Sequence, residues 1–350
     1  LHGARGGVDL PGSPLAVRHT SPTAVDREVL ENTANFLLPG SWDDPGVVTL
    51  RAELRDYEGH SDVGANMNVD LFERRVPTYW LVRVNEGSAA APDVVTDDEI
   101  AEQMDYLEAV YPVSDVNWRI LEWESVGEGP HPDIIGDLNE LGGEALLAWV
   151  IGYLITGSAP FDFPDEIFGL RTVGAGSSDP TWTLNAGAGL VAWGGRTSAH
   201  REVTLAHETN HNADRSSSGT WGRHTPFGCG APGPDPDWPY GDPAIQEVGF
   251  DTRRPWVDGS GTRYTVMDTE YPDLMSYCQI FEYPGENANQ RPTQWISPYR
   301  WEHLFDLFRE GAGETEGMAE SIESCLYVSG RVEKDGTAAL YSVFDQPGVA

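Results

Sequence analysis

The segment His207-Glu208-Thr209-Asn210-His211 constrains the fold more than any other in this chain. Residues four apart share one face of an α-helix, so both imidazoles can reach a single metal ion if the segment is helical. Glu208 would then lie beside the ion without binding it, where its carboxylate can take a proton from metal-activated water. The apolar residues Val203, Leu205 and Ala206 lead into the motif. They favour a central, partly buried helix with two zinc ligands over a solvated helix that carries two histidines by chance.

A catalytic zinc ion needs a third protein ligand and an open position for water. The chain offers three candidates, His224, Asp214 and Glu247. We favour His224, because imidazole suits zinc well. Asp214 is the alternative third ligand, because it lies three residues after His211 on the same helical face. If Asp214 joined the three histidines as a fourth ligand, the zinc would be purely structural.

A methionine in a short turn is the third unusual feature. The chain between 216 and 298 is dense in Gly, Pro, Asp and Trp, and we expect most of it to be loop. Loops of that length in a compact domain are usually functional. Near its end the chain reads Asp273-Leu274-Met275-Ser276-Tyr277-Cys278. A lone methionine is usually core filler, but this one lies in a turn beside a tyrosine and a cysteine.

The HExxH segment, the later histidine and the Met-Ser-Tyr turn together resemble the metzincin clan of zinc metallopeptidases. Within it, RHTPFGCGAPGPDPDWPYG, DLMSYC and QWISPYRWEHLF are similar to a family of large secreted bacterial and archaeal metzincin-like peptidases. The resemblance covers roughly residues 36 to 345. The family spacing places the third histidine six residues after the second, where this chain has Ser217. His224 therefore matches that position only with an insertion near 216–221.

The resemblance implies a role for each matching residue. His207, His211 and His224 would bind Zn²⁺, and Glu208 would be the general base. Met275 would form the hydrophobic floor under the metal, and Tyr277 would approach the metal or stabilise the oxyanion. Cys229 and Cys278 would form a disulfide that ties the loop of the third ligand to the methionine turn.

The resemblance also implies the architecture. It predicts an α+β fold in which a twisted sheet packs on helices, the catalytic helix crosses below the cleft, and the C-terminal half is irregular. We expect three regions: a β-rich lead-in over 1–75, the peptidase domain over 76–325, and a β-hairpin over 326–350 that opens a further β module.

The hydrophobic pattern predicts individual elements. We expect strands at 47–54, 76–84, 116–123 and 187–193 and a hairpin over 326–344. We expect helices at 97–110, 138–155 and 299–310. The helix with the HExxH segment would start near Thr197 and Ser198, which are good N-caps. The strand at 187–193 would border the cleft and pair with an extended substrate, unless it is an ordinary edge or interior strand.

The charge excludes some partners. Asp and Glu number 56 against 22 Lys and Arg, a net charge of −34 with Lys334 as the single lysine. Such a surface repels nucleic acid and anionic membranes. It is typical of proteins adapted to salt, and equally of an ordinary acidic secreted protein. We find no run of about 18 apolar residues, so we expect no spanning helix and take 138–155 as a buried helix.

An acidic loop suggests a second metal. Asp235, Asp237 and Asp242 lie within PDPDWPYGD, and hard carboxylate oxygens in a loop can bind Ca²⁺. The spacing does not match an EF-hand, and a solvated acidic loop is the simpler interpretation.

These patterns predict a secreted or cell-surface zinc endopeptidase that acts on polypeptide substrates. The alternative is a structural or adhesive module of a larger protein that keeps the metal but does not cleave. The chain starts at Leu1 without Met or a leader. We therefore expect either that a signal peptide was removed or that further domains of a longer chain adjoin it.

Overall fold

The computed structural model describes residues 2–3, 45–55, 61–72, 74–87, 90–113, 115–122, 134–172, 176–179, 190–195, 202–213, 222–226, 233–258, 261–278, 293–309, 328–332 and 338–342. The chain divides into two compact units. The first comprises Leu1–Arg74, Glu247–Thr269 and Arg309–Ala350, and the second comprises Arg75–Gln246 and Glu270–Phe308. All the predicted metal ligands except Glu247 belong to the second unit.

The second unit is built on a five-stranded sheet of order β5-β4-β6-β8-β7. Its strands are β4 (Thr78–Arg83), β5 (Asn117–Glu122), β6 (Glu166–Arg171), β7 (Gly176–Asp179) and β8 (Leu190–Gly195). The first four in spatial order are parallel, and β7 is antiparallel to β8. Every residue of β6 is buried, as expected for a strand covered on both faces. The fold is therefore mixed α/β, compatible with the expected α+β class.

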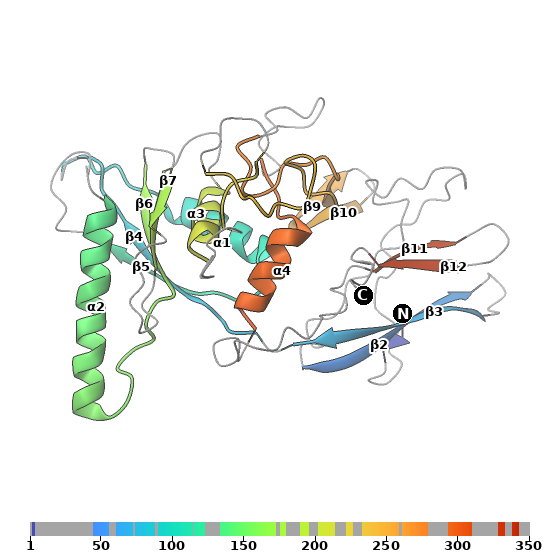
Figure 1. Ribbon diagram of the computed structural model, residues 1–350, viewed down its shortest axis with the longest axis horizontal. Coiled ribbons are helices and arrows are strands. Elements are labelled where there is room, and N and C mark those ends of the chain that lie inside the picture. The colour runs from blue at the N-terminus through green and yellow to red at the C-terminus, as the bar shows by residue number, and fades with distance from the viewer. Residues whose placement is uncertain are drawn as a thin grey trace. The chain divides into compact units, whose positions relative to one another are not determined.

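Helices cover both faces of this sheet. They are α1 (Asp97–Val110), α2 (Ile134–Thr156), α3 (Thr204–Ala213) and α4 (Pro298–Leu307). Figure 1 shows α2 on one side of the sheet and α1, α3 and α4 on the other. The predicted helix at 97–110 is confirmed, and its start is set by a capping box between Thr96 and Glu99. The predicted helix at 299–310 is also confirmed, with Ser297 as N-cap and Pro298 in the first turn.

Two glycines let helices approach the sheet closely. A Cβ at Gly169 would lie 3.1 Å from Leu138 of α2. A Cβ at Gly194 would lie 2.3 Å from the Cγ2 of Thr204, the first residue of α3. Both contacts leave no room for a methyl group without movement of a neighbour. The position of α3 therefore depends on the absence of a side chain at Gly194.

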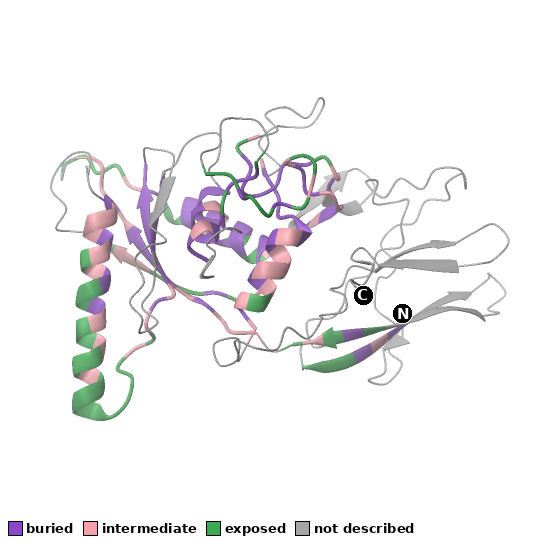
Figure 2. Ribbon diagram, viewed as in Figure 1, coloured by how far each residue is buried: buried purple, intermediate pink, exposed green. Residues whose placement is uncertain are grey.

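The interpretation of 138–155 as a buried helix is wrong. Only Ile134, Leu138, Gly142 and Ala145 of α2 are buried. The C-terminal half of α2 is coloured largely as exposed in Figure 2. Its large apolar residues Leu154 and Ile155 are 76% and 78% exposed. The helix is longer than expected, because it begins at Ile134 and includes Asp137 ahead of the predicted start.

The expectation that no helix could span a membrane also needs correction. At 23 residues, α2 is long and apolar enough to do so by length and composition. These two criteria do not distinguish a membrane span from the core helix of a soluble protein, and only 17% of its most apolar window is buried.

The strand expected at 187–193 is present as β8, but it is an interior strand among the described ones. It lies between β6 and β7, so β7 is at the edge instead. The helix that follows begins at Thr204, because 202 and 203 form a turn. The proposed caps Thr197 and Ser198 lie outside the described residues.

The first unit contains only β-structure among its described residues. Strands β1 (His2–Gly3), β2 (Gly46–Arg55) and β3 (Ser61–Leu71) form an antiparallel sheet. The strand predicted at 47–54 is confirmed as β2, with Val48 and Leu50 buried. The hairpin predicted over 326–344 is confirmed as antiparallel β11 (Val328–Val332) and β12 (Ala338–Ser342).

A further hairpin lies where we expected loop, so that prediction is wrong for 249–267. It consists of β9 (Gly249–Asp258) and β10 (Gly261–Met267). The strand pattern is interrupted by Pro255, which cannot donate a ladder hydrogen bond. The register shifts next to its partner Tyr264, so the proline lies at an irregularity in the ladder.

The close approach at Gly194 predicts a stability effect. We expect Gly194→Ala to lower the free energy of unfolding by about 1–3 kcal/mol, because the new methyl overlaps Thr204 and must displace α3. Denaturant unfolding measures the change. Gly143→Ala is the control, since a Cβ there meets nothing within 4 Å and helix propensity favours alanine. Equal effects at the two positions would contradict the packing argument.

Candidate metal centre

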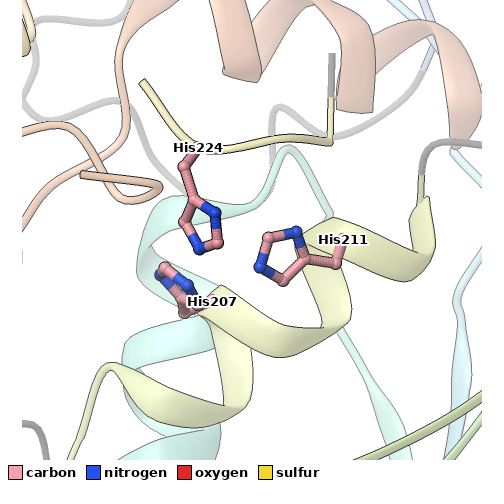
Figure 3. Close-up of side chains that lie close together, drawn as sticks. All are labelled: His207, His211 and His224. Atoms are coloured by element: carbon pink, nitrogen blue, oxygen red, sulfur yellow. The ribbon is translucent and has the colours of Figure 1, made fainter. Parts of the chain in front are cut away.

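Three histidines from two segments converge at one point. His207 and His211 come from successive turns of α3, and His224 comes from the segment 222–226 (Figure 3). One ring nitrogen of each lies within 4.8 Å of the others, and these three residues are close enough to bind a metal ion. Figure 3 shows ring nitrogens directed toward one another. No other group of three or more His, Cys, Asp or Glu residues in the described part of the chain has this arrangement.

Hydrogen bonds to backbone carbonyls orient two of the rings. The Nδ1 of His207 lies 2.7 Å from the carbonyl oxygen of Leu274. The Nδ1 of His211 lies 2.5 Å from the carbonyl oxygen of Gly222. A carbonyl only accepts, so each Nδ1 carries the proton and each Nε2 keeps its lone pair. This is the arrangement expected of histidines that bind a metal through Nε2.

Polar contacts hold α3 against its neighbours. The Asn212 side chain donates to the Glu166 carboxylate at 2.8 Å and to the Val191 carbonyl at 3.0 Å, which ties the helix to β6 and β8. The Tyr111 hydroxyl, just beyond α1, donates to the Ala206 carbonyl at 2.8 Å. The helix is thus anchored on the side facing the sheet and on the side facing α1.

The segment of the third histidine is bonded to the methionine turn. The Thr225 amide donates to the Met275 carbonyl at 3.2 Å, and the Asp235 amide donates to the His224 carbonyl at 2.7 Å. Met275 is fully buried. The turn around Met275 therefore lies against the segment that carries His224.

Burial sets the electrostatics of the site. It raises the pKa of Glu208, which follows His207 on α3, to about 8. It lowers the pKa of His211 well below the usual value, and the neighbouring His207 and His224 lower it further. A neutral imidazole is the form that binds metals. A cation at the site would in turn lower the pKa of the Glu208 carboxyl.

Tyr277 lies at the edge of the site. Its ring centroid is 4.4 Å from that of His224, in an edge-to-face arrangement, and 6.2 Å from that of His207. The residue is 42% exposed. Partial burial raises the pKa of its hydroxyl, and the charge of Glu208 raises it further. Tyr277 is therefore near both a histidine and the acid of the motif, while its surface remains accessible.

Other predicted residues have different outcomes. Asp214 and Cys229 lie outside the described residues, so the alternative third ligand and the pairing of Cys229 with Cys278 stay predictions. Glu247 belongs to the first unit and is not in the cluster.

The acidic loop makes contacts within the protein. Asp235 is 1% exposed and forms an ion pair with Arg300 at 3.1 Å. The Asp242 carboxylate accepts a hydrogen bond from the Ala244 amide at 3.0 Å. Binding of Ca²⁺ by Asp235, Asp237 and Asp242 stays a prediction, and these contacts compete with it.

Arg300 contacts the segments around the three histidines, and no sequence motif marks it. Arg300 is completely buried on α4, on the face that also buries Leu304 four residues later. An arginine spaced four residues from a core leucine is the signal that could have revealed it.

The geometry predicts which residues bind the metal. We expect alanine in place of His207, His211 or His224 to reduce the bound metal per chain strongly, because each replacement removes one of three ligands. Elemental analysis after dialysis measures this, with His303→Ala as a control, since the Nδ1 of His303 bonds to its own helix at the Tyr299 carbonyl. Retention of the full metal content in His224→Ala would remove His224 from the ligand set.

Comparison with known proteins adds no assignment. No protein-family model matches the chain. No curated protein matches it either. The resemblance to the metzincins therefore remains an expectation from the sequence motifs, and the three converging imidazoles are what the structure contributes.

Proposed function

We propose that this protein is a zinc-dependent endopeptidase with a metzincin-like catalytic domain. The observation that carries the proposal is the convergence of His207, His211 and His224 beside a buried glutamate. The helix supplies two ligands and the acid, and a segment bonded to the methionine turn supplies the third ligand. This combination suits hydrolysis of a peptide bond by metal-activated water.

The residues present fit a zinc ion. Three imidazoles are a typical ligand set of a catalytic zinc site with an open fourth position. Two of them have the tautomer that directs Nε2 to a metal. A bound zinc ion would supply Lewis-acid activation of a water molecule and of the substrate carbonyl.

Glu208 is the general base in this proposal. Its carboxylate takes a proton from the attacking water and later passes it to the leaving amine. The buried position of Glu208 supports this role, since a carboxylate away from bulk water takes up a proton more readily. The same helix carries the ligand His207 and the base, which keeps their separation constant.

Tyr277 is the candidate for stabilising the oxyanion. Its ring contacts His224, and its hydroxyl is influenced by the charge of Glu208. A phenol in this position can donate a hydrogen bond to the oxygen on which negative charge develops. The exposed part of the ring leaves its surface open to a polypeptide substrate.

We expect Glu208→Gln to lower kcat by about 10²–10⁴, because the amide cannot accept the proton of the attacking water. Cleavage of an unfolded protein, with and without a chelator and at low and high salt, measures the change. Zinc content is counted in both proteins, since the substitution leaves all three ligands in place. Equal cleavage by the two proteins at equal zinc would contradict the role of Glu208.

A wild-type protein with a full complement of zinc and no cleavage would instead support the alternative, a metal-containing structural or adhesive module. Measuring cleavage and zinc content on the same protein thus distinguishes the peptidase from the structural or adhesive module. A secreted or cell-surface location of the protein, with a polypeptide as its substrate, is also part of the proposal.

We expect Tyr277→Phe to lower kcat by about 100-fold with a smaller change in KM, because only the hydrogen bond to the transition state is lost. Steady-state kinetics on a peptide substrate measure both constants. The ring is retained, so its packing against His224 and the zinc content should not change. A rise in KM at constant kcat would show that Tyr277 binds substrate rather than stabilising the oxyanion.

A further inference from the structure

We infer that Arg300 is the positioning residue of the metal centre: its buried guanidinium joins the segment of His224 to the methionine turn and so sets the geometry of the histidines. The inference rests on the metal centre of the proposed function. The hydrogen bonds and ion pairs of Arg300 go to the backbone and carboxylates around the histidines, and its charge also lowers the pKa of His211.

Arg300 makes contacts in three directions. It donates to the carbonyl of Arg223 at 2.6 Å, the residue before His224. It forms an ion pair with Asp235 at 3.1 Å and a second, longer one with Asp273 at 3.6 Å. Arg300, Asp235 and Asp273 are all at most 1% exposed. One side chain on α4 therefore contacts three separate loop segments, through hydrogen bonds to Arg223 and Asp235 and a longer charge pair with Asp273.

The two carboxylates extend the contacts of Arg300 to His224. The Asp235 amide donates to the His224 carbonyl at 2.7 Å. The Asp273 carboxylate accepts from the Met275 amide at 2.8 Å, and the Met275 carbonyl accepts from the Thr225 amide at 3.2 Å. The backbone of 223–225 is thus held at three consecutive residues. Arg300 binds the first directly and holds the other two through Asp235 and Asp273.

The same two segments orient the other histidines. The Gly222 carbonyl, next to the residue that Arg300 binds, accepts from His211. The Leu274 carbonyl, between Asp273 and Met275, accepts from His207. Arg300 joins the segment 222–226 to the methionine turn, and all three imidazoles are positioned by these two segments. His224 belongs to the first of them, whereas His207 and His211 only donate hydrogen bonds to them.

The guanidinium suits this role better than an ammonium would. It presents five N–H donors in a rigid plane, which can serve a carbonyl and two carboxylates at once. The rings of Trp238 and Tyr299 lie 5.0 and 5.2 Å from its central carbon and restrict its position. A lysine keeps the charge but loses this fork.

The test is the affinity of the full chain for Co²⁺, together with the visible absorption spectrum of the bound ion. We expect Arg300→Lys to weaken Co²⁺ binding by about 10- to 100-fold and to change the cobalt bands, as loss of outer contacts to metal ligands does. Arg171→Lys is the matched control. Arg171 is also buried and pairs with Glu86 under the ring of Trp193, away from both segments.

Asp235→Asn is a second variant in case Arg300→Lys does not fold. It keeps the volume of the side chain and the contact of Arg300 with Asp273, so we expect a smaller loss of Co²⁺ affinity in the same direction. Thermal unfolding of all variants without metal identifies a temperature at which every variant is folded. Binding is compared at that temperature.

Loss of affinity with an altered spectrum in Arg300→Lys, while Arg171→Lys binds as the wild type does, supports the inference. Wild-type affinity in folded Arg300→Lys and Asp235→Asn, or an equal loss in Arg171→Lys, overturns it. A wild type that binds no Co²⁺ overturns the metal centre and this inference together. A wild type that binds Co²⁺ normally but cleaves nothing overturns only the proposed peptidase activity, because neither readout here depends on catalysis.

Discussion

The metal centre depends on two hydrogen bonds between helix α3 and distant loops. The carbonyls of Leu274 and Gly222 accept from the Nδ1 atoms of His207 and His211, which turns each Nε2 toward the shared point. A histidine without such a partner samples several ring orientations, and a metal would have to order it on binding. Because both carbonyls belong to loops, the site exists only where those loops are held against α3.

Holding the loops requires charge to be buried, which is costly. Burial raises the pKa of Asp273, while Arg300 and the N–H donors around its carboxylate lower it. A buried ion pair is stable only when hydrogen bonds satisfy its remaining atoms. Here the carboxylates also accept from the backbone amides of Asp237, Met275 and Ser297, at 2.9, 2.8 and 3.2 Å. Arg300, Asp235 and Asp273 thus order the irregular backbone around the two aspartates, where no helix or strand ladder among the described residues stabilises the chain.

Prediction from the sequence succeeded where the pattern is local. The helices predicted at 97–110 and 299–310 and the strand predicted at 47–54 are each indicated by residues only a few positions apart. It failed where the outcome depends on distant neighbours. The apolar run of α2 is the same whether another layer covers it or not, and the structure leaves its C-terminal half exposed. The strand β9 was not predicted, because Pro255 argues against a strand. The irregular pairing with β10 that accommodates the proline cannot be read from the sequence of β9 alone.

For the site, the sequence by itself determined that His207 and His211 lie on one face of a helix, with Glu208 next to His207, because a period of 3.6 residues brings i and i+4 together. It also ranked His224 first as a third ligand on chemical grounds, without locating it in space. Only the tertiary structure decided that His224 lies within reach of the other two and that Tyr277 lies beside it. The physical reason is that the backbone around His224 is held by Arg300, Asp235 and Asp273. Arg300 pairs with Asp235, 65 residues before it, and with Asp273, and these separations follow no local period.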